Sequence, residues 1–316
     1  MARIIEYLSD QGNECLVVVD NKKNDLYERG YHQSIPVITI PHKYFGDAIL
    51  DILEWWRPDI ALMWSIPARV VSRLCYGKGI PYMLFVRYWH LVNKPPYNDL
   101  LTDPIDKMVW PDNAWIHRHA SIVVVNAKHT RQVIERFFGI DSAVSYVPVP
   151  RLPKLGEGCR IALINPRKHE GGQLVRYLAE ANPGLLFTVY DNYKGRYPAN
   201  VEVNNYVDIP YNQLLGDTRV LLFPVTDDGC GTGRVVFEAH YLGIPVISNR
   251  KSGVPEVVPG EHLLPANATY DAWNNKLHEI NGEYDSHRGL VERQIGNYSE
   301  LEQLETIERV LEGVKC

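Results

Sequence analysis

Residues 224–258 read PVTDDGCGTGRVVFEAHYLGIPVISNRKSGVPEVV, and this stretch decides the fold. A glycine-rich turn, Gly229–Gly233, leads directly into a helical pattern over Arg234–Leu242. Gly243 ends that helix, and the apolar residues after it begin a new strand. A glycine-rich turn between a strand and a helix is typical of α/β proteins, because glycine lets the backbone turn sharply.

The start of this helix is a candidate anion site. The N–H groups of a first helical turn lack partners within the helix, and the helix dipole adds partial positive charge. Residues 231–234 supply such groups beside glycines that let a phosphate approach closely. Glu238 lies about one turn into the helix, where a carboxylate can accept hydrogen bonds from a ribose. The pattern favours a nucleotide-diphosphate site over a turn that serves the fold alone.

Two familiar nucleotide motifs are missing from this stretch. It contains neither GxGxxG nor GxxxxGK[ST], so neither a Rossmann dinucleotide site nor a P-loop is supported.

Composition narrows the class of protein. With 316 residues, of which 45% are hydrophobic and 22% charged, we expect a globular protein of two domains. The net charge of −5 disfavours a general nucleic-acid binder. No long apolar run predicts a membrane span, and no secretory signal is apparent. The five cysteines are scattered without a C-x-x-C, which indicates a reducing cytoplasm.

Alternating apolar and amphipathic segments predict a chain of α/β class. Near-continuous apolar runs are typical of strands buried on both faces of a parallel sheet. A proline cluster at 148–153 predicts a linker, which gives domains at 1–150 and 151–298 and a last amphipathic helix within 299–316. The predicted strands are Glu14–Asp20, Val37–Ile40, Ile60–Trp64, Tyr82–Val86, Ile122–Val125, Arg160–Asn165, Leu185–Tyr190, Val220–Pro224 and Pro245–Ser248.

Residues 220–258 resemble the C-terminal signature of retaining GT-B glycosyltransferases, above all glycosyltransferase family 4. Family members carry two glutamates, then G-x-P-V-I and a G-x-P-E-V loop. Here the second glutamate is Glu238, and the two later motifs begin at Gly243 and Gly253. Cys230 stands where the family has its first glutamate, with Asp227 and Asp228 close by.

The resemblance implies a GT-B fold, in which two Rossmann-like domains face a cleft. It further implies an N-terminal acceptor-side domain, a C-terminal nucleotide-sugar-binding domain and a last helix that crosses back to the first domain. The implied activity is a retaining, metal-independent, hexosyltransferase-like transfer from a UDP- or GDP-sugar to a glycan, lipid or other acceptor, without a cofactor. By the same resemblance, the donor-binding residues are Asp228, Cys230, Gly231, Thr232, Gly233, Arg234 and Glu238.

Family members also use a basic pair to neutralise the diphosphate leaving group. Residues 160–190 resemble the segment that carries this pair, with Arg167 and Lys168 in its polar loop. Glu170 occupies the position where the family usually has lysine, so Lys168 is the candidate that reaches the phosphates. Solvated loop charges are the alternative interpretation.

A second catalytic segment follows the predicted strand Tyr82–Val86. Ligand sites of α/β proteins gather at the carboxyl ends of strands. Family members often place a histidine here that touches the donor sugar, and His90 and Arg87 are near-equal candidates for that position. No carboxylate or cysteine spacing accompanies His117, His119 and His129, so we interpret these histidines as surface residues and predict no metal site.

The start of the chain departs from the family. Family members begin with a strand and a glycine-rich loop, whereas this chain begins with the helical pattern of Ala2–Gln11. We therefore expect the first domain to lack its usual first strand and to be covered by a second copy or a partner subunit. This departure, Cys230 and Glu170 keep open an alternative, a non-catalytic subunit that binds nucleotide-sugar or supports a partner enzyme. Peripheral membrane contact is a further expectation, and no carboxylate–histidine cluster supports a nucleotide-sugar 2-epimerase.

Overall fold

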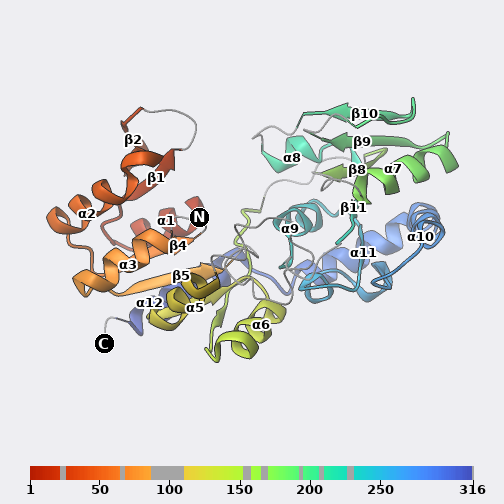
Figure 1. The fold of residues 1–316 in the computed structure, drawn as a ribbon. Coiled ribbons are helices and arrows are strands. Elements are labelled where there is room, and N and C mark those ends of the chain that lie inside the picture. Colours follow the sequence, from red (N-terminus) through yellow and green to blue (C-terminus); the bar gives the residue numbers. More distant parts are fainter. Residues whose placement is uncertain are drawn as a thin grey trace. The chain divides into compact units, whose positions relative to one another are not determined.

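The computed structural model describes residues 1–21, 26–64, 68–86, 110–151, 158–164, 170–191, 195–205, 210–225 and 231–314, without the side chains of 110–113 and 170. The chain forms two compact units (Figure 1). Unit 1 comprises Met1–Pro148 and Leu301–Cys316, and unit 2 comprises Val149–Glu300.

Unit 1 holds two sheets. The first has the order β1-β3-β2, in which β1 is parallel and β2 antiparallel to β3. The second has the order β4-β5-β6-β7 and is parallel throughout. The strands are β1 (Val17–Asn21), β2 (Glu28–His32), β3 (Ile35–Pro41), β4 (Ala61–Trp64), β5 (Tyr82–Val86), β6 (Ile122–Val125) and β7 (Ala143–Val144).

Helices cover both faces of the second sheet of unit 1 because side chains alternate along a strand. Tyr82, Leu84 and Val86 of β5 join one core with α2, α3, α5 and α6, whereas Met83 and Phe85 join another with α1 and α12. These helices are α1 (Ala2–Asp10), α2 (Phe45–Trp55), α3 (Ala68–Lys78), α5 (Trp110–His119), α6 (Lys128–Phe138) and α12 (Glu300–Glu312). The last helix of the chain therefore packs in unit 1, through Leu304, Ile307 and Leu311.

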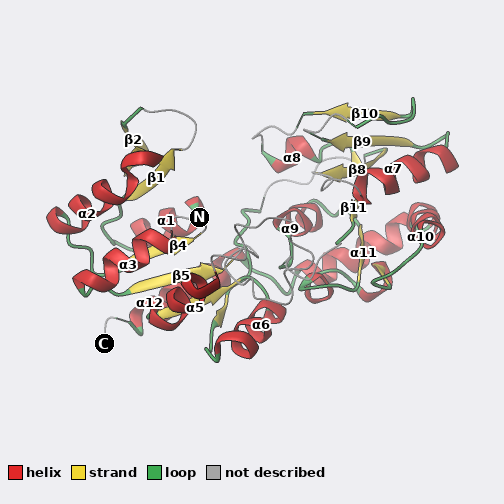
Figure 2. Ribbon diagram, viewed as in Figure 1, coloured by secondary structure: helices red, strands yellow, loops and turns green. Residues whose placement is uncertain are grey.

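Unit 2 is built on one sheet of order β10-β9-β8-β11-β12-β13, in which all neighbouring strands are parallel (Figure 2). Its strands are β8 (Arg160–Ile164), β9 (Leu186–Tyr190), β10 (Val201–Asn204), β11 (Thr218–Phe223), β12 (Val246–Asn249) and β13 (Leu263–Leu264). The predicted α/β class with parallel sheets is confirmed in both units.

Buried apolar side chains attach helices to this sheet. Ile161 and Leu163 of β8 lie in one core with residues of α7 and α10. The helix α9 packs instead with α8, α11 and β12. The helices of unit 2 are α7 (Glu170–Ala181), α8 (Tyr211–Leu214), α9 (Arg234–Tyr241), α10 (Tyr270–Gly282) and α11 (Tyr284–Ile295).

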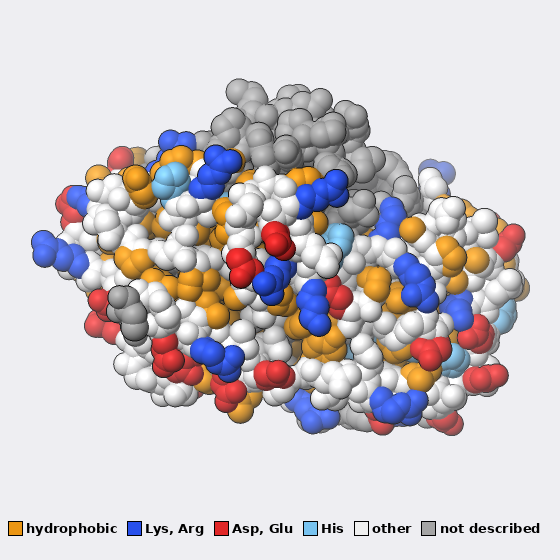
Figure 3. All heavy atoms as spheres, turned by 90° about the horizontal axis from the view of Figure 1, so that it is seen from below, with side chains coloured by type: hydrophobic (Ala, Val, Ile, Leu, Met, Phe, Trp, Pro, Cys, Tyr) orange, Lys and Arg blue, Asp and Glu red, His pale blue; other side chains and the backbone are white. Residues whose placement is uncertain are grey.

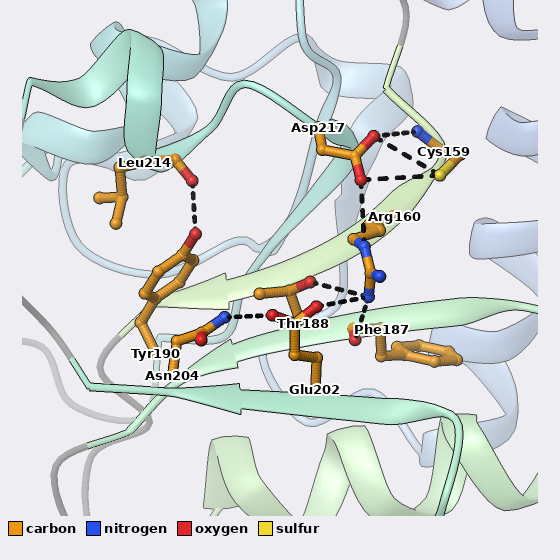
Figure 4. A network of polar contacts seen from close by, with 9 residues as sticks. All are labelled: Cys159, Arg160, Phe187, Thr188, Tyr190, Glu202, Asn204, Leu214 and Asp217. Carbon is orange, nitrogen blue, oxygen red and sulfur yellow. Dashed lines mark hydrogen bonds and ion pairs between the residues drawn. The ribbon is translucent and has the colours of Figure 1, made fainter.

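A polar network centred on Arg160 joins four segments of unit 2 (Figure 4). The Arg160 guanidinium contacts Asp217 before β11 at 3.0 Å and Glu202 on β10 at 3.0 Å. Asp217 also accepts a hydrogen bond from the backbone N–H of Cys159 at 3.2 Å. Arg160 and Asp217 lie at the starts of β8 and β11. Their contact therefore fixes the register of these two strands at the edge opposite the strands' carboxyl ends.

The surface carries charges of both signs. On the face drawn in Figure 3, acidic and basic side chains are interspersed among apolar areas. Within the described ranges, no helix has the length and apolar character needed to cross a membrane.

Candidate functional site

The strand order of unit 2 makes the carboxyl ends of β8 and β11 a candidate ligand site. From β8, the chain builds the sheet outward through β9 and β10, and then returns to add β11 on the other side of β8. A strand order that reverses in this way leaves a crevice at the carboxyl ends of the two strands, where ligands of α/β proteins bind. The pairing of Leu163 with Leu222 sets the two strand ends side by side.

Both loops carry residues predicted from the sequence. Arg167 and Lys168 follow the end of β8, and Asp228 and Cys230 follow the end of β11. All four lie outside the described residues. The described parts of this edge are the two strand ends, the start of α7 at Glu170 and the segment from Gly231 onward.

The helix α9 begins at Arg234, as the sequence pattern predicts, and Gly233 is its N-cap residue. Gly233 has a φ of +77°, a conformation that favours glycine. A Cβ atom added there would lie 2.6 Å from Cζ of Phe223, the last residue of β11. Gly231 and Thr232 are buried next to it. The glycine thus lets the first turn of α9 sit directly against the end of the strand.

An asparagine that the sequence analysis did not single out holds the loop after β11. Asn249, at the end of β12, accepts from Val225 N–H at 2.8 Å and donates to Val225 C=O at 2.8 Å. The Ser248 hydroxyl donates to Phe223 C=O at 2.6 Å. Because a side-chain amide has both a donor and an acceptor, Asn249 pairs with the N–H and the C=O of one residue, as a neighbouring strand would. The polar pair Ser248-Asn249 at the end of an apolar strand was the sequence signal that could have indicated this role of Asn249.

Glu238 is a buried acid on α9. Arg234, one turn earlier, donates from Nε to Oε1 of Glu238 at 2.7 Å. The Arg234 side chain is 64% exposed and that of Glu238 is 10% exposed. Burial raises the pKa of the Glu238 carboxyl, while the charge and hydrogen bond of Arg234 oppose the shift. The described donor-binding candidates Gly231, Thr232, Gly233, Arg234 and Glu238 therefore lie in one continuous segment of turn and helix.

Three buried histidines lie beyond Glu238 in unit 2. His262 Nε2 lies 3.0 Å from His287 Nδ1, and His240 on α9 is close enough for His262 to influence its pKa. Burial lowers the pKa of His240 and of His262 to about 3. Within the described part of the chain, no group of three or more His, Cys, Asp or Glu side chains is arranged to hold a metal ion.

The candidates in unit 1 have a different outcome. Arg87 and His90 follow the end of β5 and lie outside the described residues. The interpretation of His117 as a surface residue is wrong, because it is 1% exposed and stacks on Phe138 at 4.3 Å. The contact with Phe138 comes from the neighbouring helix α6. The sequence shows no carboxylate or cysteine partner for His117, and it could not reveal a contact between two helices.

Comparisons with known proteins give a fold but no family. Neither models of known families nor curated proteins match the sequence. Among solved structures, the chain is similar to sucrose-phosphate synthase (tll1590) from Thermosynechococcus elongatus, with a TM-score of 0.75, 13% identity, and coverage of 99% of this chain and 92% of the other. Anabaena Alr3699/HepE in complex with UDP-glucose gives a TM-score of 0.71, 12% identity, and coverage of 89% and 86%.

A third structure extends the range of activities on this fold. UDP-GlcNAc 2-epimerase from Neisseria meningitidis, bound to UDP-GlcNAc, gives a TM-score of 0.57, 12% identity, and coverage of 85% and 80%. At such identities structural similarity establishes the fold alone. The chain has the GT-B fold, with two Rossmann-like units.

Proposed function

We propose that this protein is a glycosyltransferase that moves a sugar from a nucleotide-diphosphate donor to a glycan, lipid or other acceptor. The donor occupies the carboxyl edge of the unit 2 sheet, and UDP-glucose is the first candidate because HepE was solved with it. Glu238 holds the ribose, and the N–H groups of residues 231–234 hold the diphosphate.

One observation carries the proposal: a buried carboxylate lies one turn into the helix that begins at the sheet's reversal point. Glu238 is 8% exposed, so an ionised carboxylate there has lost most of its hydration. Apart from Arg234, no described residue pairs with it. A carboxylate kept in that condition gains from hydroxyl donors, which a ribose supplies in a vicinal pair.

The proposed chemistry is retaining and metal-independent. The nucleotide diphosphate departs with about two negative charges, and the positive end of the α9 dipole stabilises part of them. Arg167 and Lys168 supply the rest, and His90 or Arg87 contacts the donor sugar. The chain has no Asp-x-Asp motif, the usual arrangement of a metal-dependent transferase. No pair of carboxylates suited to double displacement is evident, which favours a front-face reaction.

Incubation with a panel of UDP-, GDP- and ADP-sugars tests the proposal. Release of free nucleotide diphosphate together with a glycosylated product supports transfer, and the anomeric configuration of that product, read by NMR, distinguishes retention from inversion. Glu238→Ala is the matched inactive control. A product epimerised at C2 without acceptor consumption would assign the chain to the epimerase chemistry instead.

Cys230 supports a second candidate function, a non-catalytic subunit that binds nucleotide-sugar or supports a partner enzyme. The residue stands where family members have a glutamate, and a thiol cannot replace a carboxylate as an acceptor of strong hydrogen bonds. Nucleotide binding by calorimetry, without transfer or hydrolysis of any sugar in the panel, would favour this alternative. Cys230→Glu is then expected to leave the fold intact, because the same position carries glutamate in the family.

A further inference from the structure

The Arg234–Glu238 pair joins an exposed cation to a buried anion. The two residues are four apart on α9 and therefore lie on one side of the helix. Arg234 uses its Nε to contact Oε1 at 2.7 Å, a distance typical of a charge-assisted hydrogen bond. Exposed pairs at this spacing contribute little, because water solvates both ions. Here Glu238 is buried, so the small contribution typical of exposed pairs does not apply to this pair.

Among the described residues, removal of Arg234 would leave Glu238 without a compensating charge. Desolvation favours the protonated form of a buried carboxyl, and Arg234 is the group that opposes this effect. On α11, Arg288 and Glu292 lie beside Gly243, beyond the C-terminus of α9, and His287 faces His262. On α8, the Tyr211 hydroxyl contacts Pro150 C=O. Among the described residues, β12 adds Ser248 and Asn249, and α9 itself adds the buried His240 and Tyr241.

The hydrogen bond from Arg234 leaves acceptor capacity on the Glu238 carboxylate for a ligand. Arg234 engages only Oε1, and Oε2 has no hydrogen-bond partner among the described residues. A carboxylate oxygen has two lone pairs, so Oε1 can accept one further hydrogen bond and Oε2 can accept two. Two neighbouring hydroxyls can therefore bind this carboxylate while Arg234 stays in place.

We propose that Arg234 is a positioning residue, which holds the Glu238 carboxylate ionised and oriented so that its open lone pairs receive the ribose 2′- and 3′-hydroxyls of the donor. This inference rests on the proposed function. It assigns Arg234 a role through Glu238 rather than a contact with the phosphates. Ribonucleotides are then preferred over 2′-deoxyribonucleotides, and the preference depends on Arg234.

Calorimetry with UDP, and with GDP and ADP in parallel, tests the inference between pH 8 and pH 6. For Arg234→Gln, the pKa of Glu238 rises further, so affinity falls as pH falls through that value. We expect the Kd ratio of Arg234→Gln to the unmodified protein to be larger at pH 6 than at pH 8, because more of the Glu238 carboxyl is then protonated in the variant. The unmodified protein corrects for the titration of the ligand's own phosphate.

Two controls separate positioning from structure. Arg234→Lys retains the charge, so its Kd ratio to the unmodified protein is expected to stay the same between pH 8 and pH 6. Arg288→Gln breaks an i,i+4 pair on α11, and its Kd ratio is also expected to stay the same over this range. With 2′-deoxy-UDP the difference between Arg234→Gln and the unmodified protein shrinks. Thermal melting of each variant confirms that the fold is intact.

The outcomes distinguish the two proposals. If the unmodified protein binds nucleotide but the Kd ratio of Arg234→Gln to the unmodified protein does not change with pH, the role of Arg234 alone is overturned. A pH-independent loss of affinity that Arg234→Lys fails to restore also overturns it, because that result indicates a contact with the phosphate or a structural defect. Failure of the unmodified protein to bind any of the three nucleotides overturns the proposed function and this inference together.

Discussion

At the scale of single residues, Glu238 is the best-defined candidate for recognition. Its carboxylate is buried and its only described partner is Arg234. We expect Glu238→Ala to weaken binding of the cognate nucleotide diphosphate by about 2–4 kcal/mol, through loss of two charge-assisted hydrogen bonds. The melting temperature should change little, because the variant removes a buried charge together with its side chain. Calorimetry measures the loss, and equal affinities would remove Glu238 from the ribose site.

At Gly233, both the backbone conformation and the packing require glycine. Alanine there must adopt a φ of +77° and place its Cβ 2.6 Å from the Phe223 ring. The conformational cost of about 1 kcal/mol adds to an overpacking cost of about 1–3 kcal/mol, so Gly233→Ala should lower the free energy of unfolding by at least about 2 kcal/mol. Urea titration measures this change.

Matched variants identify the cause of that loss. Gly260→Ala is the control, because a Cβ at Gly260 meets nothing within 4 Å and its φ is not positive. We expect its effect to stay within about 0.5 kcal/mol. Adding Phe223→Leu to Gly233→Ala should recover part of the overpacking cost. Equal stabilities of Gly233→Ala and Gly260→Ala would contradict the packing argument.

Local pattern predicts the residues of the turn but not their tertiary partners. The helix start at Arg234 follows from the glycine-rich turn that precedes it, and the place of Glu238 follows from counting along the helix. Phe223 and Asn249 lie on other strands and contact this turn only because β11 and β12 are adjacent. The local pattern of one sequence carries no signal for such contacts.

At the scale of elements, the longer buried strands were predictable, whereas exposed strands and the two-residue strands β7 and β13 were not. The predicted bounds of Tyr82–Val86 and Ile122–Val125 are confirmed, because both are continuous apolar runs. The sequence analysis missed β2, all of whose residues are exposed, and β10, a four-residue strand at the edge of its sheet. Neither strand buries enough apolar surface to leave a hydrophobic pattern.

The buried histidines make the elements around α9 sensitive to acid. His240 and His262 have pKa values of about 3 in the folded chain, against an ordinary value of 6.5. The unfolded chain therefore binds more protons between these values, so stability is fully present above pH 6.5 and is lost as pH falls toward 3. Each histidine contributes a loss of up to about 1.4 kcal/mol per pH unit within that window.

Hydrogen exchange of peptides from α9 and α11 measures this effect. Exchange in these helices should accelerate between pH 7 and pH 5, after correction for the intrinsic pH dependence of amide exchange. His240→Leu, which removes one titrating group, should reduce the acceleration, and the exposed His278→Gln should not. The same acceleration in His240→Leu as in the unmodified chain would mean that the cluster does not govern the acid response.

At the scale of the whole molecule, the open sheet edges of unit 1 predict association. On the described residues, β1 pairs only with β3 and β4 pairs only with β5, so each leaves one edge of backbone donors and acceptors without a neighbouring strand. Such edges recruit other chains unless they are covered. We expect a dimer or larger assembly by light scattering at micromolar concentration. A concentration-independent monomer with slow amide exchange in β1 and β4 would show that these edges need no partner.

The reaction of the whole molecule depends on how the leaving group's charge is neutralised. Asp227 and Asp228 are adjacent, and in an extended segment adjacent side chains point to opposite sides, which suits a metal ion poorly. We therefore expect transferase activity to survive EDTA. We also expect Arg167→Ala combined with Lys168→Ala to lower turnover by at least about 100-fold, comparable to loss of one oxyanion-hole donor.

Because loop charges contribute little to stability, the melting temperature of that double variant should change by no more than a few degrees. Arg136→Ala combined with Lys128→Ala is the matched control, since it removes two exposed basic residues from α6 in unit 1 and leaves the unit 2 sheet edge unchanged. Activity abolished by chelation and restored by Mn²⁺ or Mg²⁺ would overturn the metal-free mechanism. A fully active Arg167–Lys168 variant would instead leave the α9 dipole as the source of positive charge, and the diphosphate would then bind to unit 2 through backbone N–H groups alone.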